Sequence, residues 1–194
     1  MDITLCVTVS NRLWQLKRTL KHNVKFTKVD TIELCIAAYN DKSVMEFLKV
    51  NYPAELNDGR IKVVEFNDTY KPKDGSNFAC GHVKKYAHSM GTGKVVFNLD
   101  ADNFVDEETI RILTGLKYNQ IYIIDPAKMS DDGRSGRIGI HRSKYIDIGG
   151  YKDRGRLDDI DFVRRAVLSG CRTVYGDCII PPIPNEINED MSYD

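Results

Sequence analysis

Short apolar segments alternate with segments of helical spacing through the first hundred residues, and this alternation constrains the fold most strongly. Each apolar run is rich in Val and Ile, and the segment after it carries apolar residues every three or four positions, as at Leu13, Leu16 and Leu20. Strands joined by helices predict an α/β fold with right-handed crossovers, a doubly wound, mainly parallel sheet and helices on both faces. The predicted strands are 3–10, 31–39, 60–66 and 94–99, and the predicted helices are 13–24, 43–51 and 77–90.

The second half departs from strict alternation, and we expect a small antiparallel element there. The patterns predict a helix over 106–116, a strand over 120–125 and an edge strand over 137–141. A Gly-Gly pair then breaks the chain before a helix over 157–169. We expect one domain over 1–180, followed over 181–194 by an extended or disordered acidic tail. The residues expected to face inward from the last helix are Ile160, Val163, Val167 and Leu168.

The charge and cysteine composition narrows the classes of partner and compartment. Lys plus Arg and Asp plus Glu both number 28 in 194 residues, so no global field recruits nucleic acid or an anionic membrane. The five cysteines are an odd number without a Cys-x-x-Cys pair, which favours reduced thiols. No apolar stretch approaches the roughly 20 residues that span a bilayer. We therefore expect a cytoplasmic protein without a membrane anchor.

The strongest local signal is Asp100-Ala101-Asp102, at the end of the apolar strand 94–99. Two hard oxygen ligands at a strand terminus can hold a divalent cation that neutralises a bound diphosphate. The alternative is a turn or a helix cap, because Asp is common in both. The chain has no glycine-rich phosphate loop, which leaves more of the phosphate binding to a metal.

A second acidic cluster, formed by Asp158, Asp159 and Asp161, opens the predicted helix at 157–169. Negative charge is favoured at a helix N-terminus, so capping is one interpretation. Carboxylates this close also raise one another's proton affinity, which suits a general base. The sequence leaves both interpretations open, and it leaves open whether this cluster faces Asp100 and Asp102.

Taken in order over residues 3–175, these segments resemble the nucleotide-sugar glycosyltransferases of the GT-A fold, nearest to the inverting family-2 type. Val9-Ser10-Asn11-Arg12 is similar to the strand end that meets the nucleotide in this family, and Leu99-Asp100-Ala101-Asp102 matches its metal motif. The resemblance implies Mn²⁺ or Mg²⁺ bound by Asp100 and Asp102. It implies that Asp41 recognises the base or ribose, and that Lys84 replaces an arginine near the phosphates. The implied donor-binding residues are Val9, Ser10, Asn11, Arg12, Asp41, Lys84 and Asp100.

The later segments resemble the catalytic and acceptor side of the same family. Asp159 stands at the position of the catalytic base, with Asp158 in place of the usual Glu and Asp161 completing the motif. Gly149-Gly150-Tyr151 is similar to the family's Gly-Gly-Phe on the acceptor side. We also assign His141 to the acceptor side, with a structural histidine as the alternative. The family often supplies a late histidine to the metal, and here all four histidines precede the last predicted helix.

The resemblance implies transfer of a sugar from a nucleoside diphosphate sugar, expected to be a UDP-sugar, to an acceptor hydroxyl with inversion. The Gln-x-x-Arg-Trp motif of processive members is missing, which favours transfer of a single sugar. Two alternatives are a non-catalytic nucleotide-sugar binding module and a nucleotidyltransferase.

Small transferases of this kind are similar to some from bacteriophages and from bacterial glycan clusters, so the acceptor is a glycan, a protein or a modified DNA base. A DNA acceptor would need a local basic patch despite the zero net charge. The basic residues expected around the site are Lys71, Lys73, Lys84, Lys85, Arg134, Arg137, Arg142 and Lys144.

Overall fold

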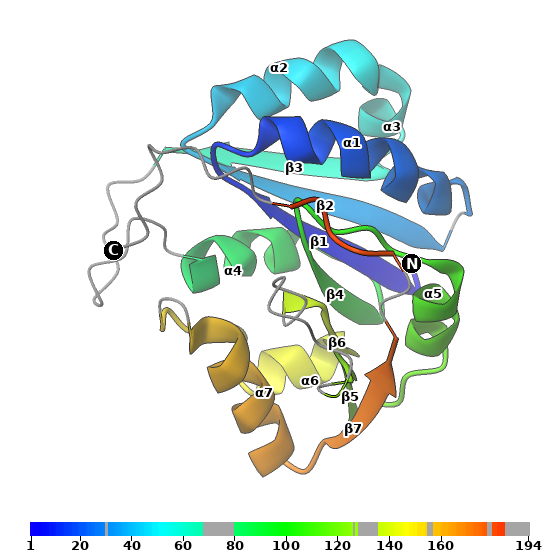
Figure 1. Cartoon of the computed structure of the whole chain (residues 1–194), viewed down its shortest axis with the longest axis vertical. Helices are drawn as coiled ribbons and strands as arrows, with labels where there is room; N and C mark the ends of the chain where they lie inside the picture. The colour runs from blue at the N-terminus through cyan, green and yellow to red at the C-terminus, as the bar shows by residue number, and fades with distance from the viewer. Residues whose placement is uncertain are drawn as a thin grey trace.

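Seven strands form one sheet in the order β3-β2-β1-β4-β6-β5-β7 in the computed structural model (Figure 1). The model describes residues 1–29, 31–67, 80–125, 127, 136–154, 157–177 and 180–184. The strands are β1 (Ile3–Val9), β2 (Ile32–Tyr39), β3 (Ile61–Phe66), β4 (Val95–Asp100), β5 (Gln120–Ile124), β6 (Ile138–His141) and β7 (Arg172–Gly176). The helices are α1 (Leu13–Asn23), η1 (Val24–Lys28), α2 (Lys42–Asn51), α3 (Pro53–Asn57), α4 (Cys80–Met90), α5 (Glu107–Thr114), α6 (Arg142–Asp147) and α7 (Asp158–Leu168).

Strands β3, β2, β1 and β4 run parallel, which confirms the mainly parallel α/β sheet predicted from the alternating pattern. Their carboxyl ends therefore meet at one edge of the sheet. The register places Thr8 of β1 beside Asp100 of β4, so the segments that follow these two strands leave the sheet side by side. Ligands of doubly wound sheets bind beyond this edge.

The predicted edge strand over 137–141 is instead internal. Strand β6 pairs antiparallel with β4 on one side and with β5 on the other. Gly139 permits this position, because a Cβ there would lie 2.3 Å from Cδ2 of Leu113. The short apolar-polar pattern indicates a strand, but it does not indicate whether that strand pairs with other strands on one side or on both. The patterns also missed β7, a strand in which only Gly176 is buried.

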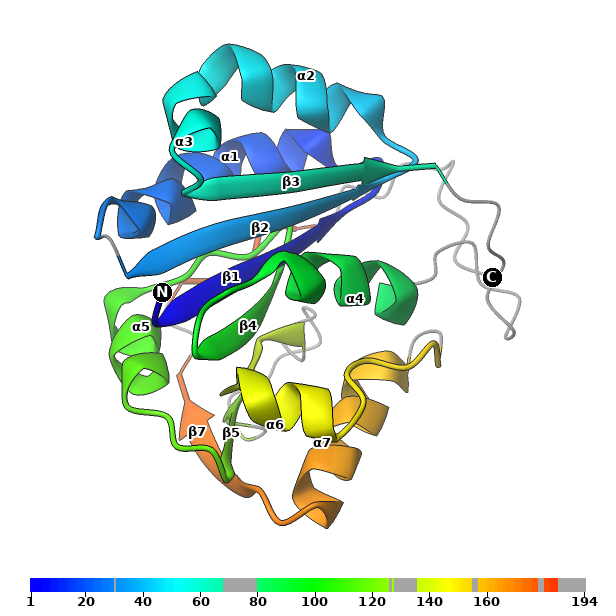
Figure 2. The ribbon, with the colours of Figure 1, turned by 180° about the vertical axis from the view of Figure 1, so that it is seen from behind.

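Two hydrophobic clusters occupy the two faces of the sheet, as expected for helices on both sides. One contains apolar side chains of α1, α2 and α5, and the other contains those of α4 and α7. Figure 2 shows α4 across the second face, where it packs on β1 and β2. None of the described helices combines the length and apolar character needed to cross a membrane.

Alternation along β4 divides its side chains between these faces. Val95, Phe97 and Leu99 belong to the cluster with α1 and α5, whereas Val96 belongs to the cluster with α4 and α7. Asn98 and Asp100 follow Val96 in steps of two, so they point to the α4 and α7 face. This face therefore receives the first carboxylate of the Asp-Ala-Asp motif.

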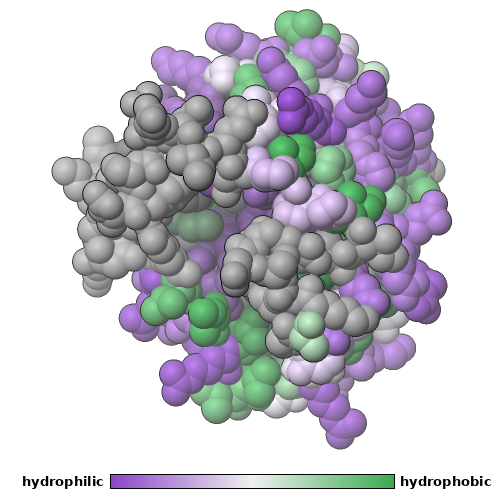
Figure 3. Space-filling model, viewed as in Figure 1, coloured by the Kyte–Doolittle hydropathy of each residue, from purple (hydrophilic) through white to green (hydrophobic). Residues whose placement is uncertain are grey.

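Helix α7 presents a different side to the core from the one predicted. Its buried residues are Asp158, Phe162 and Ala166, whereas Ile160 is 63% and Leu168 76% exposed. Val163 packs against the core as expected, but Val167 is exposed. The prediction for Ile160, Val167 and Leu168 was wrong because an ion pair draws Asp158 inward. The apolar residues on the outer side contribute to the hydrophobic surface at the lower left of Figure 3.

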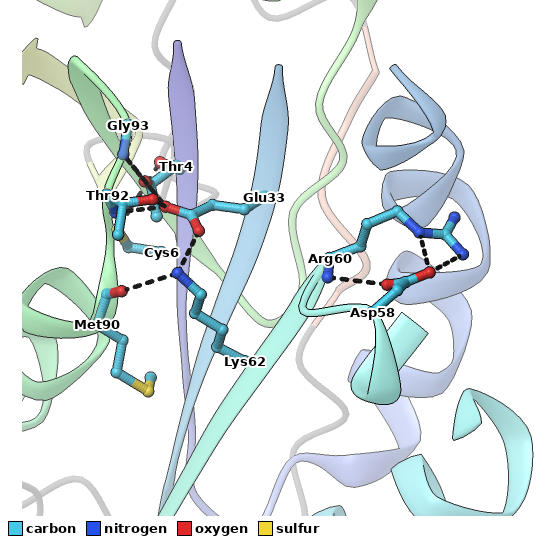
Figure 4. Close-up of polar contacts among 9 residues, drawn as sticks. All are labelled: Thr4, Cys6, Glu33, Asp58, Arg60, Lys62, Met90, Thr92 and Gly93. Carbon is cyan, nitrogen blue, oxygen red and sulfur yellow. Dashed lines mark hydrogen bonds and ion pairs between the residues drawn. The ribbon is translucent and has the colours of Figure 1, made fainter. Parts of the chain in front are cut away.

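A buried carboxylate ties the strands together at the opposite, amino edge of the sheet (Figure 4). Glu33 of β2 is fully buried and accepts hydrogen bonds from Thr4 Oγ1 at 2.6 Å and Lys62 Nζ at 2.5 Å. It also accepts from Thr92 and Gly93, in the turn between α4 and β4. Glu33 therefore joins β1, β2 and β3 to the turn that starts β4.

Candidate active site

The segment after β1 reaches the segment after β4 through a charged contact. β1 ends at Val9, Ser10 follows, and Asn11 adopts a left-handed φ of 53°, a conformation that Asn tolerates well. Arg12 then occupies the cap position of α1, and its Nη1 lies 3.7 Å from Oδ2 of Asp102. Three of the residues expected to bind the donor, Ser10, Asn11 and Arg12, thus lie at the carboxyl edge.

Asp41 lies at the same edge, one residue beyond Asn40, which has a left-handed φ of 51°. It occupies the cap position of α2 and accepts a hydrogen bond from Ser43 Oγ at 2.5 Å. The side chain is largely buried. The structure therefore brings Asp41 to the edge where β1 and β4 end, although Asp41 already has a local structural partner.

The carboxylate of Asp100 is held against the backbone of Gly136. A Cβ at Gly136 would lie only 2.2 Å from Oδ2 of Asp100, so no larger residue fits there without displacing the carboxylate. Nδ2 of Asn98 donates to Gly136 O at 2.6 Å and to Oδ1 of Asp100 at 3.3 Å. Sequence reasoning missed Asn98, a fully buried polar residue in an apolar strand, which is a local signal that it could have used.

Asp102 is buried, and its environment disfavours a lone negative charge. Burial raises its pKa to about 6, the charge of Asp100 adds to the rise, and Arg12 opposes it. Asn103 Nδ2 donates to Oδ1 of Asp102 at 3.1 Å. Two neighbouring carboxylates with this incomplete compensation fit a divalent cation, which would remove the repulsion between them.

A segment from the end of the described chain crosses the same region. The backbone N–H of Ile183 donates to Asp102 O at 2.9 Å, and Gln15 Nε2 donates to Ile183 O at 3.4 Å. Arg137 donates to Asn103 Oδ1 at 2.9 and 2.6 Å and to the carbonyl of Ile180. Part of the expected tail thus lies beside the Asp-Ala-Asp motif, and residues 185–194 lie outside the described residues.

The acidic start of α7 meets a buried lysine of α4. Lys84 is 1% exposed, and its Nζ lies 2.7 Å from Oδ1 of Asp159 and 2.9 Å from Oδ2 of Asp158. Burial alone would lower the pKa of Lys84, but charge interactions with Cys80 and Asp159 outweigh it and hold the pKa well above the ordinary value. The sequence suggested a role at the phosphates; the structure pairs this ammonium with carboxylates.

Asp159 has the properties that a general base at neutral pH requires. Burial raises its pKa to about 7, Asp158 and Asp100 add to the rise, and Lys84 opposes it. Asp159 pairs with Lys84 of α4, and Asp100 points to the sheet face that α4 and α7 cover. The end of β4 and the start of α7 therefore lie on the same face of the sheet.

Asp161 does not belong to this cluster, although the sequence grouped it with Asp158 and Asp159. Its Oδ2 accepts from Arg165 Nε at 2.7 Å, one turn along α7. Arg165 also donates to the carbonyls of Ile148 and Gly150. Asp161 thus orients an arginine that fixes the glycine turn, because positions 159 and 161 point to different sides of a helix.

The glycine turn positions Tyr151 behind Lys84. Gly149 and Gly150 have left-handed φ values of 79° and 61°, and a Cβ at Gly150 would lie 2.8 Å from the Tyr145 ring. Tyr151 is fully buried, and its ring lies 4.9 Å from Nζ of Lys84. Its hydroxyl has no hydrogen-bond partner among the described residues. Tyr151 therefore lies beside the ammonium that pairs with the carboxylates, and it has no exposed surface for an acceptor.

The structure does not bring His141 to the acidic residues. β6 runs antiparallel to β4, and His141 pairs with Val95, five positions before Asp100. At about 3.3 Å per residue this separation is about 16 Å along the strand. His141 lies instead beside the Tyr118 ring. His141 thus lies near the end of β4 opposite to Asp100, a position that gives no support to its acceptor-side assignment.

Several residues of the basic patch expected from the sequence are not at the surface. Lys84, Arg137 and Lys144 are buried, so they do not form part of a surface patch for DNA. Lys71, Lys73 and Arg134 lie outside the described residues. Within the described ranges, no group of three or more His, Cys, Asp and Glu residues could hold a metal ion. The protein ligands that fit a cation in this part of the chain are the pair Asp100 and Asp102.

The amino-acid sequence matches no protein-family model and no curated protein. Solved structures do resemble this chain in fold. A mannosyltransferase from Pyrobaculum calidifontis, in complex with GDP-mannose and Mn²⁺, has a TM-score of 0.71 at 12% identity over 96% of this chain. The chain spans 58% of that protein. A glucosyl-3-phosphoglycerate synthase from Mycobacterium tuberculosis, in complex with Mg²⁺ and UDP, has a TM-score of 0.63 at 9% identity over 97% of this chain and 73% of its own.

The chain has a GT-A-type fold. The same architecture also occurs in a nucleotidyltransferase from Methanothermobacter thermautotrophicus, with a TM-score of 0.61 at 13% identity, over 93% of this chain and 88% of that protein. Identities this low show the GT-A-type fold and leave the reaction to be argued from the residues at the carboxyl edge.

Proposed function

We propose that the chain is a metal-dependent glycosyltransferase. It transfers one sugar from a nucleoside diphosphate sugar, with UDP as the nucleotide, to an acceptor hydroxyl with inversion. Two positions support the proposal: Asp100 ends β4 on the sheet face that α4 and α7 cover, and the ion pair with Lys84 of α4 holds Asp159 at the start of α7. The structural neighbours in complex with GDP-mannose and Mn²⁺, and with UDP and Mg²⁺, support this class of reaction.

The metal-binding part of the proposal concerns Asp100 and Asp102. When bound, Mn²⁺ or Mg²⁺ would neutralise charge on the diphosphate that leaves. Asn98 and Gly136 hold the Asp100 carboxylate, and Asn103 holds that of Asp102. Because the two carboxylates raise each other's energy when both are ionised, a cation is the partner that their chemistry favours.

Asp159 is the proposed base. It accepts the proton of the acceptor hydroxyl as the acceptor oxygen bonds to the anomeric carbon, and the bond from that carbon to the diphosphate oxygen breaks. The proton ends on the Asp159 carboxylate, and the nucleoside diphosphate leaves as the anion. Attack from the side opposite the leaving group inverts the configuration. A carboxyl group with a pKa near 7 is suited to this task because the ideal base titrates near the working pH.

The donor side of the proposal uses Arg12 and Asp41. Both lie at the carboxyl ends of parallel strands, where nucleotides bind in doubly wound sheets. Arg12 supplies positive charge next to Asp102, and Asp41 supplies acceptor oxygens for ribose or base groups. The acceptor is proposed to be a glycan, a protein or a hydroxymethylated DNA base, and an acceptor that is DNA would bind more weakly as salt increases.

The test is a screen of UDP- and GDP-sugars for binding, by thermal shift with Mn²⁺, followed by product analysis. We expect one donor to raise the melting temperature only with metal and to yield nucleoside diphosphate plus transferred or free sugar. Binding without any product would favour a non-catalytic module. Release of pyrophosphate from a nucleoside triphosphate plus sugar phosphate, with no reaction of nucleotide sugars, would identify a nucleotidyltransferase and refute the proposal.

A further inference from the structure

We propose that Lys84 is a positioning residue for the base. Its ammonium holds the Asp159 carboxylate ionised and in one orientation, and Asp158 is the counter-charge that anchors Lys84. The inference rests on the proposed function, since it assigns Asp159 as the base. It gives Lys84 a different task from the phosphate contact that the sequence suggested.

The ammonium group of Lys84 is paired with side chains of α7. Its Nζ donates a hydrogen bond to Asp159 and forms an ion pair with Asp158, both in the first turn of that helix, and the side chain is almost completely buried. A buried ammonium is tolerated only when it is paired. The two carboxylates supply that pairing, and Lys84 in turn fixes the position of α7 against α4.

The ring of Tyr151 lies beside the Lys84 ammonium. The cation lies 4.9 Å from the centre of its ring, a distance at which the aromatic face attracts it. The ring is itself fixed, because it stacks on Phe162 at 4.4 Å and contacts His88 edge-on at 5.3 Å. The pair of carboxylates and the aromatic face together hold Nζ toward Asp159.

The charges around Asp159 show what the ammonium contributes. Asp158 lies beside it on α7, the charge of Asp100 at the end of β4 acts on it, and Cys80 and Tyr151 belong to the same charged cluster from α4 and the glycine turn. These groups are neutral or negative, whereas Lys84 is a cation in direct contact with the Asp159 carboxylate. Without Lys84, the protonated and inactive form of Asp159 would be favoured at neutral pH.

The experiment compares Lys84→Met and Lys84→Arg with wild type, and uses Lys49→Met as the control. Lys49 is an exposed lysine of α2 outside the expected sites, so its substitution leaves the buried cluster intact. We expect Lys84→Met to lower kcat at pH 7 by about 100-fold, at the lower end of what general base catalysis contributes. The donor Kd should stay within about twofold, and Lys84→Arg should restore part of kcat because it keeps the charge.

The pH profile separates positioning from a purely structural role. In Lys84→Met the acidic limb of kcat should move to higher pH, whereas Lys49→Met should keep the wild-type profile. Weaker donor binding with an unchanged kcat would overturn the inference and would support a contact between Lys84 and the donor phosphates instead. An unchanged kcat and profile would also overturn it. If Lys84→Met does not fold, the double variant Lys84→Met/Asp158→Asn removes one carboxylate together with the cation and is tested in the same way.

A measurement that needs no enzymatic turnover tests this inference independently of the proposed function. Carbon NMR of protein with ¹³C-labelled aspartate side chains follows the titration of Asp159 directly, with Asp159→Asn to assign its signal. Loss of Lys84 should move the Asp159 midpoint to higher pH, and an unchanged midpoint would overturn the inference. Wild-type protein that turns over no nucleotide sugar would refute the proposed function, and the NMR titration would still decide the role of Lys84.

Discussion

The guanidinium of Arg12 lies 3.7 Å from the carboxylate of Asp102, joining the segment after β1 to the segment after β4. The contact is made beyond the carboxyl ends of neighbouring parallel strands, which Thr8 and Asp100 hold in register. It leaves Asp102 only partly compensated, because burial and Asp100 still raise its pKa to about 6.

The raised pKa of Asp102 predicts a pH dependence for metal binding. A carboxylate must lose its proton to bind a cation, so protons compete with the metal below the pKa. We expect the affinity for Mn²⁺ to be constant above pH 7 and to fall by about tenfold per pH unit below about 6. Calorimetric titrations at several pH values measure this, and an affinity that does not change between pH 4.5 and 7 would exclude Asp102 as a ligand.

Gly136→Ala should disturb the Asp100 carboxylate while the fold persists. The new methyl group would lie 2.2 Å from Oδ2 of Asp100, which has to move away. We expect Mn²⁺ affinity to fall by at least about tenfold, in the range reported for loss of groups that orient metal ligands. The control is Gly115→Ala, where no described atom comes closer to the new Cβ than 3.6 Å. Equal metal affinity in the two variants would contradict the position of Asp100.

The rate should depend on pH through Asp159. Because burial raises its pKa to about 7, the basic form is lost as pH falls below that value. We expect kcat to rise with pH, with an acidic limb near 7, and to level off above it. Asp159→Asn should lose about 100-fold or more in kcat at pH 8 and retain donor binding. A flat profile between pH 5.5 and 8, or near-normal turnover by Asp159→Asn, would remove Asp159 from the role of base.

Glu33→Gln should destabilise the fold without involving the candidate site, because Glu33 lies at the opposite edge of the sheet. The pKa of Glu33 is lowered: burial alone would raise it, but the bonds from Lys62, Thr4 and Thr92 outweigh burial. We expect a loss of about 3 kcal/mol in the free energy of unfolding at pH 7, measured by urea denaturation. Glu108→Gln, in an exposed pair with Arg111, should change this free energy far less, because water screens an exposed ion pair.

The effect of Glu33→Gln on the free energy of unfolding should also depend on pH. A carboxylate with a lowered folded-state pKa stabilises the fold above its unfolded pKa, here the ordinary Glu value of 4.5, and this contribution is lost as pH falls through the folded-state value. The difference between wild type and Glu33→Gln should therefore be full above about pH 5 and shrink below it. A difference that stays constant from pH 7 to pH 3 would argue against an ionised Glu33.

Much of the fold could be predicted because local patterns suffice for the parallel half. Apolar β-branched runs followed by helical spacing identify β1 to β4 and the helices α1, α2 and α4, and parallel strands bring their ends together. The antiparallel element of the second half was predicted, but the two neighbours of β6 were not, since pairing on both sides depends on Gly139 and its approach to Leu113. The sequence therefore did not show that His141 lies opposite Val95, at the other end of β4 from Asp100.

The sequence predicted the two acidic motifs of the candidate site, but it did not predict which residues these carboxylates contact. Asp100 and Asp159 stand out in the sequence by their positions at a strand end and a helix start. The partner of Asp159 is Lys84, 75 positions away, and no local pattern indicates that pairing. Asp161 resembles its neighbours in sequence, and only the helical geometry and Arg165 separate it from them.

The most direct test asks whether a metal at Asp100 and Asp102 lies close to Asp159. Mn²⁺ is paramagnetic and broadens the NMR signals of nearby carbons, and Mg²⁺ is the diamagnetic control. With ¹³C-labelled aspartate side chains, Mn²⁺ should broaden the signals of Asp100, Asp102 and Asp159 and leave that of Asp58, at the opposite edge of the sheet, sharp. An Asp159 signal as sharp as that of Asp58, while those of Asp100 and Asp102 broaden, would contradict a shared site.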